Sequence, residues 1–476
     1  NMTKPRELLC LSFCQSDSQG KALSPAFLIN NIREMFPEME IRQCGEAQDS
    51  MELLELPGIS LDYLLKGLAG ESYRDDAVFQ ELYSWYLQSP EYRTLVKRLT
   101  EVSFSERPSD MIGKTVAGIL YGEVSPYSAT RLERFAACAF AHFLQYGLKV
   151  TERAEYEFRA MDMGNVMHMA LEKFAAEVRK EGLDWADLTE EERNRIIDDC
   201  LDQVSADYGN TVLKSSARNE YMIERTRRIL RRTVWALQEQ LKHGEFRPEG
   251  FEVKFEGGRI DRVDIMEEPE NNRVYVKVID YKTGNTSFDM LALYHGLQLQ
   301  LMIYLDGALK VEQRKYPDRE IVPAGIFYYN VKDPMIQEKI HADVERVQDQ
   351  MLKKLKMNGL VQADDDVSIK IDETLASIPV SRNKDGSFSR RSSVASRQQF
   401  DALGEYVRRK ICDIRESILD GNAAVAPYEL GKKNACTYCP YSTVCGFDRK
   451  IPGYEFHRLP SFTESDLWKK IMKEDE

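Results

Sequence analysis

The sequence lacks any apolar run of the roughly 18 residues needed to cross a bilayer, so it does not predict an integral membrane protein. Its first residues also lack a basic segment followed by an apolar core, and we therefore expect no secretory signal. Nine cysteines among 476 residues are too few, and odd in number, for a disulfide scaffold. Together these absences predict a protein of a reducing compartment, most simply the cytoplasm.

Basic residues are in deficit. The chain has 65 Lys and Arg against 78 Asp and Glu, a net charge of −13. This balance argues against a protein that coats nucleic acid non-specifically, although it permits an enzyme with a local basic channel. The 43% hydrophobic and 30% charged residues are typical of a folded protein, and the length fits about three domains. Because the chain begins with Asn1 and not with Met, we expect a piece of a longer protein.

A complete P-loop is also missing. Gly113-Lys114-Thr115 matches the end of that motif, but Pro108 stands where its first glycine is required. We therefore predict that this chain does not hydrolyse ATP by itself. Residues 1–120 otherwise have a mostly helical pattern and carry no chemical motif.

Two helices with candidate ligands are predicted next. Ser128 is a suitable N-cap for a helix that carries Cys138, and Gly164 opens another that carries His168. Taken alone, such a Cys is typical of a small buried hydrophobe, and such a His of a partly exposed helix end. Neither residue by itself indicates a site.

A basic cluster lies within residues 183–250, which we predict to be helical and highly charged. Such a run is usually a solvated face, but here it stands out against an acidic background. We predict that this cluster contacts phosphate. Its members are Arg225, Arg227, Arg228, Arg231 and Arg232.

The strongest signal is a β-hairpin with carboxylates. Residues 258–266 and 273–282 alternate as strands do and are rich in β-branched and aromatic residues. If the turn centres on residues 270–271, paired positions sum to 541. Asp261 then lies opposite Asp280.

This register has a chemical consequence. Directly opposed residues have Cβ atoms about 4.5–5.5 Å apart, so Asp261 and Asp280 repel each other unless a cation lies between them. Their apolar strands make unpaired charge costly, and a hard divalent cation with oxygen ligands resolves both problems. Lys282 projects to the same face and can orient a water or offset charge on a phosphate. The alternative is a surface hairpin with ordinary ion pairs, because Asp-x-Lys alone is a weak motif.

Two further patterns follow the hairpin. A helix predicted over residues 295–304 places Gln300 and Tyr304 on one face, as satisfied core groups or as a ligand-facing edge. Near the C-terminus, three cysteines with C-x2-C-x5-C spacing are one thiolate short of a zinc or four-iron site. Spacing alone leaves both metals open. These cysteines are Cys436, Cys439 and Cys445.

In this order, the motifs resemble the RecB-like branch of the PD-(D/E)XK nuclease superfamily. Within it they are most similar to AddB-type subunits of bacterial AddAB helicase–nucleases. The resemblance implies an α/β fold, with a restriction-endonuclease-like mixed sheet flanked by helices and preceded by a mostly helical helicase-like remnant. It implies a helicase-like part without an ATP site, a nuclease domain with an iron–sulfur staple, and a tail. Their ranges are 1–120, 121–455 and 456–476. The motifs are Gly164 with His168, Gly258-Arg259-Ile260-Asp261, Asp280-Tyr281-Lys282, and Gln300 with Tyr304.

The resemblance also implies residue roles. Mg²⁺ or Mn²⁺ is bound by the side chains of His168, Asp261 and Asp280 and by the backbone carbonyl of Tyr281. The catalytic residues are Asp261, Asp280 and Lys282. The residues that contact DNA or support the site are Gln300 and Tyr304. A [4Fe–4S] cluster is held by Cys138, Cys436, Cys439 and Cys445.

The implied function is that of a metal-dependent DNA exonuclease, acting on the 5′-ended single strand inside a helicase–nuclease that resects double-strand breaks for recombination repair. The implied partners are DNA and an AddA-type helicase–nuclease subunit, with no membrane involved. A second hypothesis is a non-catalytic scaffold, in which a cysteine-bound cluster organises a DNA- or partner-binding domain. The intact Asp261, Asp280 and Lys282 argue against such degeneracy.

Overall fold

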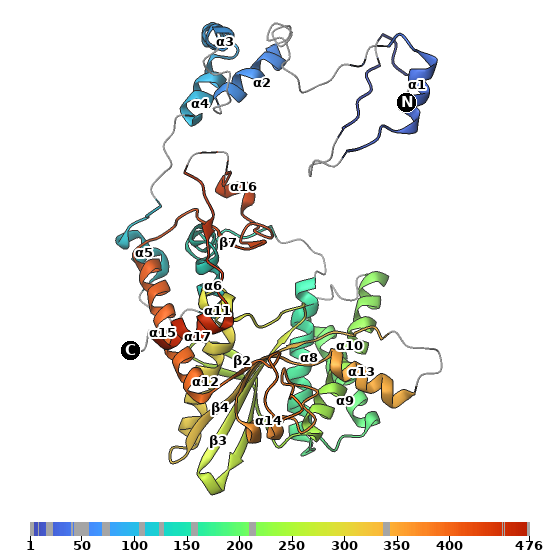
Figure 1. The fold of residues 1–476 in the computed structure, drawn as a ribbon, viewed down its shortest axis with the longest axis vertical. Coiled ribbons are helices and arrows are strands. Elements are labelled where there is room, and N and C mark those ends of the chain that lie inside the picture. The colour runs from blue at the N-terminus through green and yellow to red at the C-terminus, as the bar shows by residue number, and fades with distance from the viewer. Residues whose placement is uncertain are drawn as a thin grey trace. The chain divides into compact units, whose positions relative to one another are not determined.

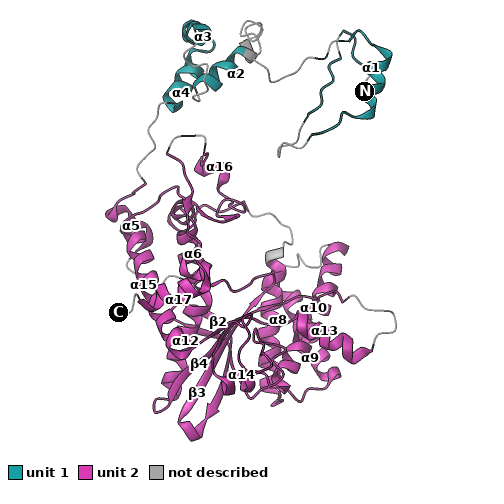
Figure 2. Cartoon of the chain, viewed as in Figure 1, with its two compact units in different colours: residues 1–107 teal, residues 108–476 magenta. Residues whose placement is uncertain are grey.

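The computed structural model forms two compact units, residues 1–107 and residues 108–476 (Figure 2). The domain boundaries predicted at residues 120 and 455 stay predictions. No helix among the described residues is both long and apolar enough to span a membrane. The residues that the structure describes are 4–7, 9–15, 22–39, 41, 57–68, 77–103, 110–122, 128–153, 160–208, 216–336, 343–449, 451 and 453–473.

The regular elements of the first unit are helices, as the pattern predicts, while its described residues before Phe27 are not helical. A small apolar core joins three of its helices through Leu64, Phe79, Tyr86 and Val96. The Tyr86 hydroxyl is buried within this core and is satisfied by the Ser60 hydroxyl at 2.8 Å. The helices are α1 (Phe27–Met35), α2 (Pro57–Leu68), α3 (Ala77–Gln88) and α4 (Arg93–Ser103).

The second unit is built on a mixed six-stranded sheet of order β1-β2-β3-β4-β5-β6. The pairs β3–β4 and β5–β6 are parallel and the others antiparallel. This arrangement confirms the predicted mixed sheet flanked by helices. The strands are β1 (Arg247–Phe255), β2 (Gly258–Glu268), β3 (Arg273–Lys282), β4 (Glu320–Asn330), β5 (Asn358–Gln362) and β6 (Val394–Ala395).

Helices cover both faces of this sheet (Figure 1). On one face lie α8 (Ala160–Lys180), α9 (Glu190–Asp207), α10 (Ala217–Lys242), α13 (Val344–Lys354) and α14 (Asp365–Ile371). On the other lie α6 (Ala129–Ala137), α11 (Met290–Tyr294), α12 (Gln300–Lys315), α15 (Arg397–Leu419) and α17 (Glu464–Lys473). The remaining elements are α5 (Lys114–Tyr121), α7 (Ala139–His142), a π-helical turn (Phe143–Gly147), β7 (Tyr428–Leu430), β8 (Lys433–Asn434), α16 (Ser442–Cys445) and β9 (His457–Arg458).

The β2–β3 register agrees with the predicted sum. Arg262 pairs with Ile279 and Val263 with Val278, so both pairs sum to 541. The next position along the strands brings together Asp261 and Asp280. Side chains alternate across a strand, and Val276 and Val278 pack in the core on the α12 side of the sheet. Asp280 and Lys282 follow at the same period and therefore face α12.

Three predicted helix limits are wrong. The helix that carries His168 begins at Ala160 and not at Gly164, which lies in its second turn. Gly164 packs closely against the end of β3, since a Cβ there would lie 3.2 Å from the Thr283 hydroxyl oxygen. The helix predicted over residues 295–304 begins at Gln300, because Gly296, with φ of +79°, ends the preceding α11.

The third error concerns residues 183–250, which are not helical to their end. α10 stops at Lys242, and β1 begins at Arg247. Gly244 lies between them, where a Cβ would come within 2.4 Å of the Ile371 carbonyl oxygen. Pro248 then fits the start of an edge strand but not a helix interior.

A buried charged trio lies under the α8–α10 side of the sheet. The Arg262 Nε atom is 2.6 Å from Asp264 Oδ1, and Lys277 Nζ is 3.0 Å from Asp264 Oδ2. Burial by itself raises the pKa of Asp264, but the two cations outweigh it and hold that pKa below its ordinary value. The guanidinium also lies over the rings of Trp185 and Phe251. The trio therefore links β2 and β3 directly behind the carboxylate pair.

We predict that Asp264→Ala lowers the free energy of unfolding by about 3–5 kcal/mol, because it leaves two buried cations without their counter-charge. Denaturant titration measures this loss. The matched control is Glu320→Ala, which breaks exposed pairs with Arg273 (2.8 Å) and Arg397 (2.6 Å) and should cost about 0–1 kcal/mol for each pair. Equal losses in the two variants would contradict the contribution to the free energy of unfolding that is assigned to the trio.

Candidate active site

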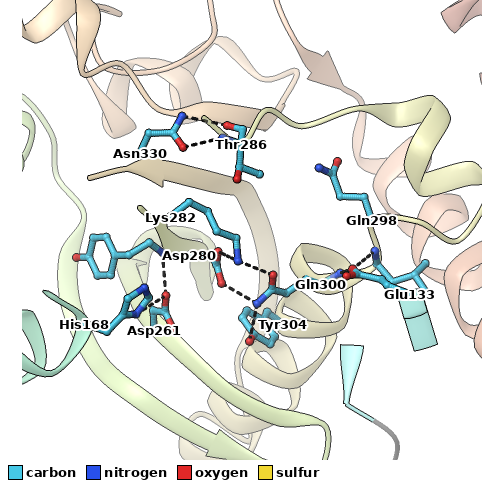
Figure 3. A network of polar contacts seen from close by, with 12 residues as sticks. Glu133, His168, Asp261, Asp280, Lys282, Thr286, Gln298, Gln300, Tyr304 and Asn330 are labelled. Carbon is cyan, nitrogen blue, oxygen red and sulfur yellow. Dashed lines mark hydrogen bonds and ion pairs between the residues drawn. The ribbon is translucent and has the colours of Figure 1, made fainter. Parts of the chain in front are cut away.

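Four elements deliver the predicted site residues to one place (Figure 3). They are the helix α8, the strands β2 and β3, and the start of the helix α12. The structure brings together the nuclease-motif side chains that were named from the sequence. These residues are His168, Asp261, Asp280, Lys282, Gln300 and Tyr304.

Asp261 is the centre of one half of the site. Its Oδ2 atom lies 3.4 Å from His168 Nδ1 and accepts the backbone N–H of Tyr281 at 2.8 Å. The ring of Tyr281 is buried on the opposite side of the sheet and meets His168 edge to face. The Tyr281 backbone, predicted to offer its carbonyl to a metal, therefore passes directly beside Asp261.

Asp280 is the centre of the other half. Its Oδ2 atom lies 2.6 Å from Lys282 Nζ, and its Oδ1 accepts a hydrogen bond from Gln300 Nε2 at 2.9 Å. Gln300 also accepts from Lys282 Nζ at 2.7 Å and donates to the Tyr304 hydroxyl at 2.8 Å. The amide side chain of Gln300 thus holds Asp280, Lys282 and Tyr304 in fixed positions. Gln300 and Tyr304 are hydrogen-bonded within the site, and their contact with DNA stays a prediction.

Glu252 is a further acid that the sequence did not indicate. His168, Glu252 and Asp261 can each offer a ligand atom, and these atoms lie within 4.8 Å of one another. Phe251 pairs with Arg262 and Val253 with Ile260, so Glu252 stands beside Asp261 in the β1–β2 pair. Its φ of +49° is unusual for a side chain larger than glycine and is typical of a constrained site.

Desolvation dominates the electrostatics. Burial raises the pKa of Asp261 to about 7 and that of Asp280 to about 7, and for Asp280 the neighbouring Asp261 raises it further. Burial also raises the pKa of Glu252, which Arg259 partly offsets. Burial lowers the pKa of His168. Each of these shifts favours the neutral form of its group.

A second missed acid, Glu133, lies on α6. Its Oε1 atom accepts the backbone N–H groups of Leu299 and Gln300 at 2.7 and 3.0 Å. Burial raises the pKa of Glu133 to about 7, against the lowering effect of these hydrogen bonds and of Lys282. A sequence signal was lacking, because the partners are 166 and 167 positions away.

The predicted cysteine site is also assembled. All four cysteines line one small apolar cavity, and none of the cysteines in the described ranges forms a disulfide. Burial raises the pKa of Cys138, and burial with the neighbouring thiols raises that of Cys436 to about 11. The residues are Cys138, Cys436, Cys439 and Cys445.

The predicted phosphate contact of the arginine cluster is not supported. Arg227 and Arg231 on α10 pair with Asp198 on the adjacent α9. Arg228 and Arg232 pair with Asp333, the former at 2.7 Å. Four of the five cations therefore have acidic partners within the unit, which favours the solvated-face alternative. Sequence reasoning missed this because the acids come from other elements.

Comparison with known proteins agrees with this geometry. Residues 126–446 match the PD-(D/E)XK nuclease superfamily, and the chain belongs to that superfamily. Curated relatives named as the B subunit of an ATP-dependent helicase/deoxyribonuclease include those of Lachnoclostridium phytofermentans and Alkaliphilus metalliredigens, which are 37% and 33% identical over the whole chain. A Thermoanaerobacter relative of the same name is 31% identical over 99% of the chain. The chain spans 43% of the length of each of these three relatives. The resemblance to AddB-type subunits is thus confirmed.

We predict that, in the presence of a chelator, the second unit loses thermal stability as the pH rises. Asp261 and Asp280 have pKa values of about 7 when folded but about 3.9 when unfolded. The folded state therefore binds more protons between these values, so a stabilising contribution present below pH ~4 is lost as the pH passes 7. Melting temperatures measured from pH 5 to 8 should show the decline.

The Asp280→Asn variant tests the cause of this decline. It removes one titrating group while keeping the side-chain shape, so its melting temperature should fall less steeply with pH than that of the wild type. The control is Asp349→Asn, which removes an exposed acid paired with Lys353 and should leave the slope unchanged. A slope that is the same in all three proteins would show that the buried carboxylates do not titrate in this range.

Proposed function

We propose that this chain is the nuclease part of a helicase–nuclease subunit and hydrolyses phosphodiester bonds of single-stranded DNA. One observation carries the proposal. In a member of a nuclease superfamily, the carboxylates of Asp261 and Asp280 lie beside His168, while Lys282 is held next to them by Gln300.

A divalent cation fits this donor set. Carboxylate oxygens and an imidazole nitrogen suit Mg²⁺ or Mn²⁺. The proposed ligands are the side chains of His168, Asp261 and Asp280 and the carbonyl of Tyr281, with Glu252 as an additional donor. When bound, the cation holds the scissile phosphate and lowers the pKa of the attacking water. Its charge would also favour the ionised forms of the acids that burial disfavours.

Lys282 supplies the complementary group. Its ammonium lies 2.6 Å from Asp280 Oδ2, so it reaches the same space as the proposed metal ligands. There it can orient the water that attacks phosphorus, or offset the charge that builds on the phosphate oxygens. Gln300 keeps the ammonium aimed at this space, and Tyr304 keeps the Gln300 amide from rotating away.

The biological setting is proposed from the relatives. Their name couples an ATP-dependent helicase to a deoxyribonuclease, which supports a DNA strand delivered by unwinding. We infer an AddA-type partner, action on the 5′-ended strand during resection of double-strand breaks, and a location in the cytoplasm. We propose no nucleotide site at Gly113-Lys114-Thr115, because Lys114 begins the helix α5 and its ammonium pairs with Asp420 at 3.0 Å.

We further propose a [4Fe–4S] cluster at the four cysteines. The four thiols line one apolar cavity, which supports a shared metal centre. Their spacing along the chain leaves zinc and iron open, and the resemblance to AddB-type subunits favours iron. The cluster would join Cys138 to the C-terminal cysteines and so connect distant parts of the unit.

The direct test is Asp280→Ala. We expect Mg²⁺-dependent cleavage of a single-stranded oligonucleotide to fall below detection, because the variant loses a proposed metal ligand. The fold should survive, since removing one of two repelling acids relieves the desolvation cost. Gel-based cleavage assays and melting temperatures in chelator give the two readouts. Cleavage at the wild-type rate would refute the assignment of the site.

Lys282→Ala separates the two halves of the proposed mechanism. It removes no metal ligand, so the Mn²⁺ affinity should stay the same or improve. Turnover should fall by roughly 10²–10⁴-fold, the usual contribution of such a group. A loss of metal binding with normal turnover at saturating metal would contradict its role. If the wild type bound DNA but did not cleave it, a non-catalytic scaffold would be the better description.

For the cysteine site, we predict that protein purified without oxygen is brown and contains about four iron atoms per chain. Replacing any one of the four cysteines by Ser should remove the colour and destabilise the second unit, because a closure over about 300 residues is worth on the order of 4–5 kcal/mol in the analogous disulfide case. Absorption spectra, iron analysis and thermal melts measure these effects.

The control for that prediction is Cys412→Ser, which alters an exposed cysteine on α15 outside the cysteine-lined cavity. Its colour and melting temperature should match those of the wild type. A colourless protein with one zinc per chain would reject the iron cluster but keep the four-cysteine site. Normal folding of Cys138→Ser without any metal would reject both.

A further inference from the structure

The helix α12 begins without a cap of its own. Its N-cap residue is Leu299, which makes no side-chain capping hydrogen bond. The first N–H groups of a helix have no acceptor within the helix, and a buried N-terminus needs one from elsewhere. By contrast, α9 and α15 are capped by their own Thr189 and Ser396, each in a reciprocal capping box.

Glu133 supplies the missing acceptor from a different helix. Its Oε1 atom accepts the N–H groups of Leu299 and Gln300, at 2.7 and 3.0 Å (Figure 3). A carboxylate is favourable at this position because the helix dipole places partial positive charge there. The acceptor therefore depends on the position of α6, not on the local sequence of α12.

The second of these N–H groups belongs to the residue that organises the catalytic side chains. The side chain of Gln300 accepts from Lys282 Nζ at 2.7 Å and donates to Asp280 at 2.9 Å. A shift or rotation of the first turn of α12 would move this amide relative to both groups. Small misplacements matter here, since an error of about 1 Å can cost 10²-fold in rate.

The helix α6 is itself held within about one turn of Glu133. It stops at Cys138, one of the four cysteines of the cavity. One turn earlier, the Arg134 guanidinium lies 5.6 Å from the centre of the Tyr441 ring, in the loop that carries the other three cysteines. The Tyr441 hydroxyl in turn donates to the Val150 carbonyl at 2.9 Å. Thus α6 spans from the cysteine loop to the start of α12.

We propose that Glu133 is a positioning residue for the nuclease reaction. It holds the first turn of α12 so that Gln300 keeps Lys282 and Asp280 in register, and it transmits the position of the cysteine-anchored α6 to the site. This inference rests on the proposed nuclease function. It adds a residue that lies outside the four nuclease motifs and acts through Gln300.

The test compares Glu133→Ala and Glu133→Gln in the full chain, with Mg²⁺ and a single-stranded oligonucleotide. Glu133→Ala leaves two buried N–H groups without an acceptor, and kcat should fall by about 10- to 100-fold while KM changes by less than about threefold. A neutral amide oxygen can also accept these two hydrogen bonds, so the Glu133→Gln variant should restore kcat to within about threefold of the wild type. Both variants are assayed well below their melting temperatures.

A matched control removes a helix-capping carboxylate far from the site. Glu192→Ala disrupts the capping box of α9, where Glu192 accepts from the Thr189 backbone at 3.0 Å. Its kcat should equal that of the wild type even where its stability falls. An equal loss of kcat in Glu192→Ala and Glu133→Ala would overturn the proposal, because the effect would then be general destabilisation.

Hydrogen exchange gives a readout that does not depend on cleavage. Amide exchange of a peptide covering residues 299–304 should quicken by about fivefold in Glu133→Ala, the effect of losing an N-cap, and not in Glu133→Gln or Glu192→Ala. An unchanged exchange rate or a wild-type kcat in Glu133→Ala would reject the positioning role. If the wild type itself failed to cleave while the exchange pattern held, the proposed nuclease function would fail and the role of Glu133 in fixing α12 would stand.

Discussion

Two buried carboxylates on adjacent strands are the constraint on which the rest of the site depends. Burial raises the pKa of both Asp261 and Asp280 to about 7, so the metal-free fold tolerates them more readily as neutral acids than as anions. The surrounding groups compensate in part. His168 and a backbone N–H face Asp261, while Lys282 and Gln300 face Asp280. Under the proposed function, a divalent cation would favour the ionised forms of both acids.

The sheet makes this arrangement possible because it keeps two sets of buried charged side chains on opposite faces. On the α8–α10 side, Arg262, Asp264 and Lys277 form a closed set of paired charges that supports the strands. On the α12 side, the same strands present Asp261 and Asp280, whose burial is compensated only in part by His168 and Lys282. Alternation along β2 and β3 thus places a structural ion network and a chemical site back to back, a single residue apart.

Much of the site followed from local sequence because a hairpin is a local structure. The side-chain period of two and the position of the turn set the β2–β3 register, so the opposition of Asp261 and Asp280 and the direction of Lys282 could be predicted. The spacing of Cys436, Cys439 and Cys445 also indicated a metal site, because the three cysteines lie within ten residues of one another. The match of Cys138 and His168 to these motifs came from resemblance to a family, since each is an ordinary helical residue by itself.

What the sequence by itself determined is therefore the hairpin, its register and the residues spaced for chemistry along it. Only the tertiary structure decided which distant groups complete the site. Glu252 reaches it through the β1–β2 pairing and Glu133 through a contact 166 positions away, while the arginines of α10 were neutralised by acids from α9 and Asp333. Such partners produce no regular spacing in the sequence. Packing between elements brings them together, and the geometry within one element does not.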